Sequence, residues 1–174
     1  EKYFPLKVFI CNSCWLVQVP EYANADQIFN ENYAYLSSTS KSWVHHSKNF
    51  ATAAIEKLAL NEKSSVLEIA SNDGYLLQHF QNRKIPSIGI EPTKICASLS
   101  RKKGIDTREN FFNLEFAEKL KEEKTFDLII ANNVLAHVPD LNNFIKGIKK
   151  VLKPDGFVSI EFPHLMQMIR HNQF

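Results

Sequence analysis

The chain has 174 residues, 44% of them hydrophobic, which suffices for one domain with a sizeable core and a small appendage. Its 21 basic and 19 acidic side chains are mixed along the sequence and give a net charge of +2, so neither nucleic acid nor an anionic membrane is indicated as a partner. No apolar run reaches membrane-spanning length, and no secretory signal pattern is present. Three cysteines are too few for a disulfide scaffold, so we expect a cytoplasmic protein.

Residues 1–22 form a short β-rich piece, in which two apolar runs flank the pair Cys11 and Cys14. The pattern predicts two strands around a Cys-x-x-Cys turn, as in half of a zinc knuckle. A tetrahedral zinc site needs two more ligands, and one Cys-x-x-Cys pair is a weak signal. His45 or His46 is a conceivable substitute, although both fall within a predicted helix.

Residues 23–61 are predicted to be a polar linker with a helical turn, followed by a helix that ends at Leu60. Ser40 is the expected N-cap of that helix, since serine side chains accept hydrogen bonds from the first free backbone N–H groups. The apolar positions of the helix recur at helical spacing. They are Val44, Phe50, Ala54, Ile55 and Leu58.

From residue 62 to residue 174, strand and helix patterns alternate. Repeating β-α units with apolar strands favour an α/β fold: a Rossmann-like, doubly wound, mostly parallel sheet in the order 3-2-1-4-5. The last strand is then an apolar sheet edge, from which we expect pairing into a homodimer. The predicted strands are 65–69, 86–91, 105–107, 126–131 and 157–162, and the predicted helices are 74–83, 93–103, 113–122, 141–152 and 163–171.

The most informative stretch is 66–91, a strand containing Glu68, a loop of small residues, a helix predicted to begin at Asp73-Gly74, and a second strand that ends at Glu91. In such a βαβ unit the loop amides and the helix N-terminus receive an anionic group, and the second carboxylate binds a ribose diol. The sequence therefore predicts a nucleoside cofactor at this edge of the sheet.

The loop disfavours a dinucleotide. Ala70 and Asn72 place β-carbons where a pyrophosphate needs glycines, and Asp73 would repel two phosphates. S-adenosylmethionine has a cationic sulfonium and one carboxylate, which suits the loop better than a nicotinamide or flavin cofactor. An ordinary strand-turn-helix without a cofactor stays open. The predicted cofactor-binding residues are Glu68, Ala70, Asn72, Gly74, Glu91 and Asn132.

The place of each predicted site residue relative to the strands and the loop suggests its role. Glu91 is expected on the ribose, Gly74 at a close approach to the methionine moiety, and Asn132 on its amino group. Glu68 either touches the methionine end or orients the loop. His137 follows the fourth strand, where ligands of such sheets bind, so it is expected to meet the substrate; packing or facing water is the alternative.

These patterns resemble class I S-adenosylmethionine-dependent methyltransferases over about residues 62–163. A narrower resemblance, over nearly the whole chain, is to the deoxysugar C-methyltransferases, which act on nucleotide-linked 4-keto sugars. The segments that match are Cys11-x-x-Cys14-x-Leu16-Val17-Gln18, Tyr33-x-Tyr35-x-Ser37-Ser38-x-Ser40-x-Ser42-Trp43-x-x-His46, Glu68-Ile69-Ala70-Ser71-Asn72-Asp73-Gly74-Tyr75 and Glu161-Phe162-Pro163-His164.

This resemblance implies C-methylation through an enolate. It places Tyr33 and Tyr35 over the cofactor and the sugar, and it gives His137 a role in supporting the ketone oxygen or orienting the base. It also implies zinc in the intact protein, held by Cys11 and Cys14 with a second cysteine pair that this chain lacks. The family's C-terminal half, with a Tyr-His-Glu-His segment thought to hold the base, is expected beyond residue 174.

Two rival functions remain from the sequence. The first is a methyltransferase that acts on oxygen or nitrogen of another small metabolite. The second is a zinc-knuckle binding module whose methyltransferase fold is inactive. The sequence Asn132-Asn133-Val134-Leu135 differs from the motif of amino-group methylases that act on nucleic-acid bases, which agrees with the absence of a basic surface.

Overall fold

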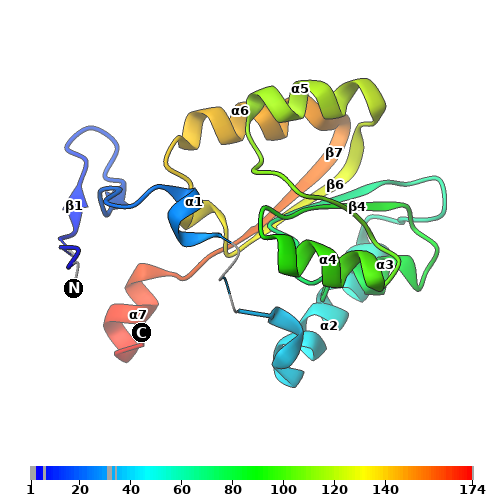
Figure 1. Cartoon of the computed structure of the whole chain (residues 1–174), viewed down its shortest axis with the longest axis horizontal. Helices are drawn as coiled ribbons and strands as arrows, with labels where there is room; N and C mark the ends of the chain where they lie inside the picture. Colours follow the sequence, from blue (N-terminus) through cyan, green and yellow to red (C-terminus); the bar gives the residue numbers. More distant parts are fainter. Residues whose placement is uncertain (1–2, 6, 31–32, 34, 174) are drawn as a thin grey trace.

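The computed structural model describes residues 3–5, 7–30, 33 and 35–173. A five-stranded sheet forms the centre, with α5 (Leu114–Glu123) and α6 (Leu141–Val151) on one face. The other face is covered by α2 (Lys41–Lys57), α3 (Leu77–Gln81) and α4 (Lys94–Lys102), as Figure 1 shows. A small N-terminal hairpin and α7 (Leu165–His171) lie at one side of this three-layer body.

The sheet consists of β3 (Val66–Ile69), β4 (Ser87–Ile90), β5 (Asp106–Arg108), β6 (Phe126–Asn132) and β7 (Leu152–Glu161). The order is β5-β4-β3-β6-β7, and every pair in it is parallel. This confirms the predicted α/β fold and the strand order. The central strands are buried on both faces because helices cover both, which explains why their sequences are apolar without alternation.

The core has two parts, one on each face of the sheet. Beneath α5 and α6, buried side chains such as Leu120, Phe144 and Val151 pack against Leu67 and Ile129. On the opposite face, α2 and α3 contribute a second cluster that includes Ala51, Leu77 and Phe80. The two clusters fix the sheet between the helices and leave the carboxyl ends of the strands free.

Three predicted boundaries are wrong by three residues or more. The helix predicted to end at Leu60 ends at Lys57. The first helix of the sheet domain begins at Leu77 rather than at Asp73-Gly74, because a turn with left-handed residues occupies the first positions. The last strand begins at Leu152 rather than at residue 157. The strand contains an irregularity: Phe126 pairs with Leu152, but Leu128 pairs with Phe157.

The N-terminal piece contains β1 (Phe9–Ile10) and β2 (Val17–Gln18), an antiparallel pair that flanks the cysteine turn as predicted. The linker that follows has one short helix, α1 (Ala25–Ile28), and a 3-10 turn, η1 (Ser37–Thr39). The predicted N-cap of α2 is confirmed, since the Ser40 side chain accepts a hydrogen bond from the Trp43 N–H. Among the helices of the described residues, none combines the length and apolar character needed to cross a bilayer.

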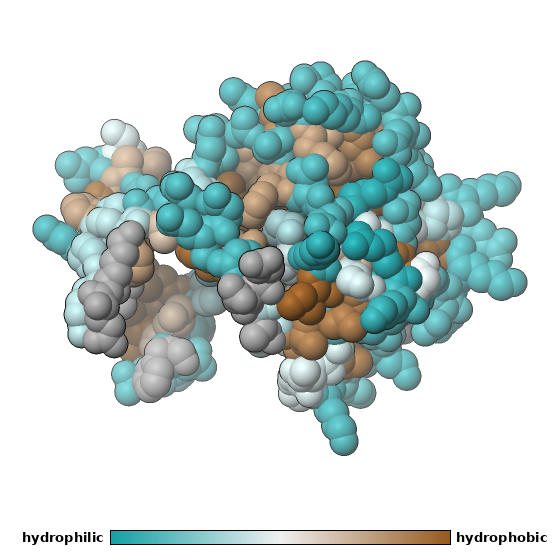
Figure 2. All heavy atoms as spheres, in the orientation of Figure 1, coloured by the Kyte–Doolittle hydropathy of each residue, from teal (hydrophilic) through white to brown (hydrophobic). Residues whose placement is uncertain are grey.

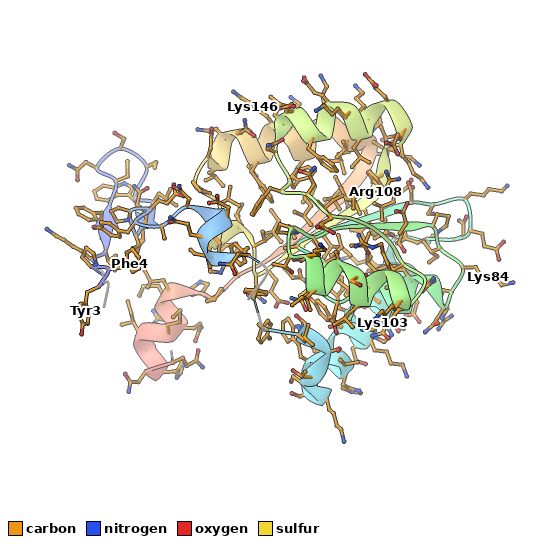
Figure 3. All side chains as sticks on the ribbon, viewed as in Figure 1. Tyr3, Phe4, Lys84, Lys103, Arg108 and Lys146 are labelled. Atoms are coloured by element: carbon orange, nitrogen blue, oxygen red, sulfur yellow. The ribbon has the colours of Figure 1, made fainter. Side chains whose placement is uncertain are left out.

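Hydrophilic residues cover much of the face seen in Figure 2, interrupted by hydrophobic patches. Basic side chains such as Lys84 and Lys146 project from the periphery (Figure 3). Exposed apolar residues gather in three places: the N-terminal hairpin, strand β7 and helix α7. They include Phe9, Ile10, Trp15, Val17, Phe157, Val158, Phe162, Leu165, Met166 and Ile169.

Candidate active site

A cavity of about 730 Å³ lies where the carboxyl ends of β3, β4 and β6 meet the linker. This is the edge at which ligands of doubly wound sheets bind. The predicted site residues from the sheet and those from the linker line the same cavity. The members of the predicted set that line it are Tyr33, Tyr35, Ala70, Asn72, Glu91, Asn132 and His137.

The loop after β3 has an unusual backbone. Ala70, Asn72 and Gly74 all have positive φ angles, of 59°, 48° and 76°. These alternate positions are the ones at which a glycine-rich loop would carry glycine, since only glycine adopts this region without a steric penalty. The loop therefore keeps the path of a glycine-rich loop while two of its three positions carry side chains.

Gly74 lies away from the cavity. A β-carbon at this position would lie 2.4 Å from Ile105 Cδ1 and 2.7 Å from Ser100 Oγ, so a side chain here would collide with α4 and the start of β5. Its N–H donates to the Ser71 carbonyl at 3.0 Å. The structure thus explains this glycine by packing and by its φ angle; the predicted approach to a methionine moiety stays a prediction.

Glu91 is buried and organises the loop. One carboxylate oxygen accepts the backbone N–H of Asn72 at 2.9 Å, and the other accepts the N–H of Thr93 at 2.8 Å and its hydroxyl. A carboxylate has about four acceptor positions and these bonds occupy three, so Glu91 can accept one hydroxyl of a diol without losing any of them. Burial raises the pKa of Glu91, and the hydrogen bonds from Thr93 and Asn72 oppose that rise.

Glu68 lies beneath the cavity, and its side chain is 1% exposed. Neither of its carboxylate oxygens has a hydrogen-bond partner among the described residues, and the same holds for the buried Asn132 Oδ1 on the neighbouring strand β6. Burial raises the pKa of Glu68 well above its usual value and the charge of Glu91 raises it further, whereas the nearby Tyr75 hydroxyl, which does not reach hydrogen-bonding geometry, partly opposes the rise. Buried acceptors without donors indicate that a cationic or donor group belongs here.

The charge of the cavity also favours a cation. Its ionisable lining residues are Glu91, Asp140, His137 and three tyrosines, with no Lys or Arg among the residues that the structure describes there. Below the loop, Lys103 at the end of α4 contacts Asp73, with Nζ 2.7 Å from its carbonyl and 3.2 Å from its carboxylate (Lys103 is labelled in Figure 3). A group with a positive charge and one ribose fits this lining better than a diphosphate does.

The linker forms the wall of the cavity opposite the strand ends. The Phe29 ring lies 5.4 Å from the ring of Tyr33 and 6.2 Å, edge to face, from that of His137. Burial raises the pKa of Tyr33, and the nearby Glu91 charge adds to the rise. Tyr35 is more exposed than Tyr33, and its backbone carbonyl rather than its ring makes the contact with the loop. His137 lies in a 3-10 turn, η2 (Leu135–His137), and is open to solvent.

Sequence reasoning missed an aromatic stack beside the cavity. Trp43 lines the cavity, and its ring stacks on that of Tyr75, 6.2 Å between centroids, and on that of His46, 4.9 Å between centroids. His46 Nε2 lies 3.2 Å from Glu161 Oε2 at the end of β7. The signal was present, because Trp43, His46 and Glu161 all belong to the matching segments, but the sequence does not show that they meet.

The two cysteines form an open turn. The Ser13 N–H donates to Cys11 Sγ at 3.4 Å, and the backbone groups of Cys14 and Ser13 lower the pKa of the Cys11 thiol. A lower pKa favours the thiolate that zinc requires. Within residues 3–5, 7–30, 33 and 35–173, no three His, Cys, Asp or Glu side chains are grouped to hold a metal ion. Zinc binding by Cys11 and Cys14 therefore stays a prediction.

Comparisons with known proteins agree with this geometry. A family model described as "Methyltransferase domain" matches residues 43–173, and one described as "Putative zinc binding domain" matches residues 1–29. Among solved structures, the DhpI-SAM-HEP complex superimposes with a TM-score of 0.53 at 20% identity, covering 79% of this chain and 64% of that one. At that identity the likeness shows the fold.

Two curated relatives are similar in sequence. The C-methyltransferase NovU of Streptomyces niveus is 28% identical over 175 residues, covering 100% of this chain and 41% of that protein. The malonyl-[acyl-carrier protein] O-methyltransferase of Priestia megaterium is 27% identical over 136 residues, covering 75% of this chain and 49% of that protein. The chain thus spans less than half the length of these relatives.

Proposed function

Because the chain belongs to the methyltransferase family whose model matches residues 43–173, we propose that it transfers a methyl group from S-adenosylmethionine. The observation that supports this best is the shared cavity, in which the strand-end residues Glu91 and Asn132 face the linker residues Tyr33 and Tyr35. A donor and an acceptor must lie within reach of each other for methyl transfer, and one cavity lined from both sides provides that arrangement.

In this proposal Glu91 binds the ribose diol, and Asn132 receives the methionine ammonium near the buried carboxyl group of Glu68, whose ionised form a bound cation would favour. The cofactor supplies an electrophilic methyl group on a cationic sulfur. The acidic lining is compatible with that charge, and the left-handed loop at Ala70 and Asn72 lies beside the cofactor. The fit rests on the unpaired acceptors, which a cationic amino acid moiety would satisfy.

We further propose that the acceptor is a nucleotide-linked 4-keto-deoxysugar, methylated on the carbon beside its ketone. A base removes the proton from that carbon, and the electron pair of the C–H bond forms an enolate. The enolate carbon then bonds to the methyl group, while the electron pair of the breaking S–CH₃ bond stays on sulfur. His137 supports the enolate oxygen, and Tyr33 or Tyr35 contacts the sugar. The alignment with the C-methyltransferase NovU over the whole chain supports methylation on carbon.

The lining distinguishes this acceptor from an anionic one. A carboxylate acceptor would lie among Glu91, Asp140 and His137 without a Lys or Arg among the described lining residues. A neutral ketone ring meets no such repulsion, and the diphosphate of a nucleotide sugar would then lie outside this cavity. The similarity to an O-methyltransferase of malonyl-[acyl-carrier protein] keeps O-methylation as the second candidate.

The test combines isotope exchange with product analysis. The intact protein is incubated with a nucleotide-linked 4-keto-deoxysugar in D₂O without cofactor, and then with methyl-labelled S-adenosylmethionine. We expect deuterium at the carbon beside the ketone, and a new C–CH₃ group by NMR and mass spectrometry. A new O–CH₃ or N–CH₃ group would overturn the C-methylation proposal, and no cofactor binding by calorimetry would overturn the methyl-transfer proposal itself.

We also propose a division into three parts: a partial zinc-binding piece over 1–22, a linker and helix over 23–61, and a cofactor domain over 62–174. The zinc proposal is supported by the family match over residues 1–29 and by the lowered pKa of Cys11. Zinc titration of the wild type and of Cys14→Ser, followed by metal analysis, tests it.

A further inference from the structure

Asn72 is joined to the linker by both ends of its side-chain amide. Its Oδ1 accepts the backbone N–H of Ser37 at 2.9 Å, and its Nδ2 donates to the carbonyl of Tyr35 at 3.1 Å. Both partners are more than 30 residues away in the sequence. The asparagine is 7% exposed and Ser37 is 6% exposed, so water competes little for these bonds.

The backbone of the same residue is joined to the predicted ribose-binding group. The Asn72 N–H donates to Glu91 Oε2 at 2.9 Å. One residue thus connects the cofactor half of the cavity, through Glu91, with the linker half, through Tyr35 and Ser37. All four residues line the cavity.

The presence of asparagine rather than glycine at position 72 requires an explanation, because glycine adopts the φ angle of 48° found there with less strain. Asparagine tolerates this region better than most residues, although not as well as glycine. The two hydrogen bonds to the linker are what asparagine adds and glycine lacks. Ala70, with φ of 59°, is a matched position in the same loop for which no side-chain hydrogen bond is possible.

We propose that Asn72 is a positioning residue that couples occupation of the cofactor cavity to the placement of linker residues 35–37 over the acceptor. The inference rests on the proposed function for the identity of the cofactor. A ligand held against Glu91 restrains the Asn72 backbone, and the restrained side chain then holds Tyr35 and Ser37. Thermodynamic linkage requires the reverse effect as well: a held linker strengthens cofactor binding.

The first experiment compares Asn72→Gly with Ala70→Gly by residue-resolved hydrogen exchange in the ligand-free chain. Both variants place glycine at a positive φ angle, so the loop path is preserved in each. We expect the Ser37 amide to exchange at least about tenfold faster in Asn72→Gly, because two hydrogen bonds are lost, and to change less than about twofold in Ala70→Gly. Equal Ser37 exchange in the wild type and Asn72→Gly would overturn the proposal.

A second variant covers the case in which Asn72→Gly fails to fold. Asn72→Asp keeps an oxygen that accepts the Ser37 N–H and replaces the donor to the Tyr35 carbonyl with an acceptor. We expect a weakened linker, measured as faster cleavage near residues 33–40 by a dilute protease than the change in global stability of the same variant accounts for, since the new carboxylate lies close to Glu91. Unchanged cleavage in this variant would contradict the proposal as directly as the exchange result.

Coupling is measured with S-adenosylhomocysteine as the probe. In the wild type, saturation with this compound is expected to slow Ser37 exchange about tenfold further. In Asn72→Gly the compound is expected to bind up to about tenfold more weakly, because the linker no longer adds to the affinity, and to give no added protection at Ser37 when saturating, a response that a purely structural role would not change.

The outcomes separate the two proposals. Equal ligand protection of Ser37 in the wild type and the variant, with binding confirmed by calorimetry, would overturn the coupling alone. No binding of S-adenosylhomocysteine to the wild type would overturn the cofactor assignment and the coupling together. The difference in ligand-free exchange would then still report the connection between Asn72 and the linker.

Discussion

At the scale of single residues, Glu68 is a carboxylate held without a hydrogen-bond partner in the described core. Because its folded-state pKa is raised by burial and by the charges of Glu91 and Asp73, folding favours its protonated form. The stability that protonation adds is fully present below the unfolded value of about 4.5, and it is lost as the pH rises through the folded pKa. The ligand-free protein is therefore strained at this residue near neutral pH.

We expect Glu68→Gln to stabilise the ligand-free chain by about 1–3 kcal/mol at pH 7.5, and the gain to vanish below about pH 4.5. The same change should weaken binding of S-adenosylmethionine about tenfold, since the ammonium loses a negative charge beneath it. Urea denaturation at several pH values and calorimetry measure the two effects. A variant less stable than the wild type at neutral pH, or one with unchanged affinity, would refute this account of Glu68.

The sequence allowed us to predict which residues at strand ends belong to the site. Glu91 and Asn132 follow apolar strands, and parallel strands bring their carboxyl ends to one edge, so both line the cavity as predicted. The contacts of Asn72 were not predictable, because its partners lie more than 30 residues upstream in a linker without a periodic pattern. Side-chain hydrogen bonds between distant segments leave no local signature in a sequence.

At the scale of elements, the packing of the loop on α4 and β5 depends on Gly74. Gly74→Ala adds a β-carbon at 2.4 Å from Ile105 and strains a φ angle of 76°. We expect a loss of about 2–4 kcal/mol in the free energy of unfolding, which combines the overpacking and left-handed penalties. Denaturant titration followed by circular dichroism measures it.

Gly104→Ala is the matched control for that experiment. Gly104 has a similar φ angle of 82°, but its β-carbon would meet only the flexible end of Gln81, at 3.0 Å. The control should therefore lose only the left-handed penalty of about 1–2 kcal/mol. If both alanine variants lost the same stability, the contact with Ile105 and Ser100 would not be the reason for glycine at position 74.

The left-handed backbone of the loop after β3 also explains why α3 begins later than the sequence predicts. The sequence suggests a helix from Asp73-Gly74, because small residues followed by Leu76 and Leu77 are typical of a strand-turn-helix unit. The positive φ angles at Ala70, Asn72 and Gly74 delay the helix to Leu77. Glycine at the third position is a visible signal of such a backbone and asparagine at the second is a weaker one, but alanine at the first hides it.

At the scale of the whole molecule, the order of the sheet was predictable because each strand, helix and turn has a strong local pattern and because crossovers in parallel sheets are right-handed. The same reasoning placed the last strand at an edge, where β7 is found with β6 as its neighbour. The extent of apolar exposure beside that edge, over α7 and the N-terminal hairpin, could not be predicted from the pattern of the separate elements.

The exposed edge leads to a prediction about association. Phe157 and Val158 on β7 are 55% and 39% exposed, next to a row of backbone groups that only a further strand would pair. We propose that two copies of the chain associate through this edge, and we expect light scattering to show a dimer at high concentration.

The variant Val158→Lys should be monomeric, since charge on an edge strand opposes pairing. Ile95→Lys, which places the same charge at an exposed aliphatic position on α4, should leave the dimer intact. A wild-type chain that stays monomeric while the β7 amides are protected from exchange would contradict pairing through this edge.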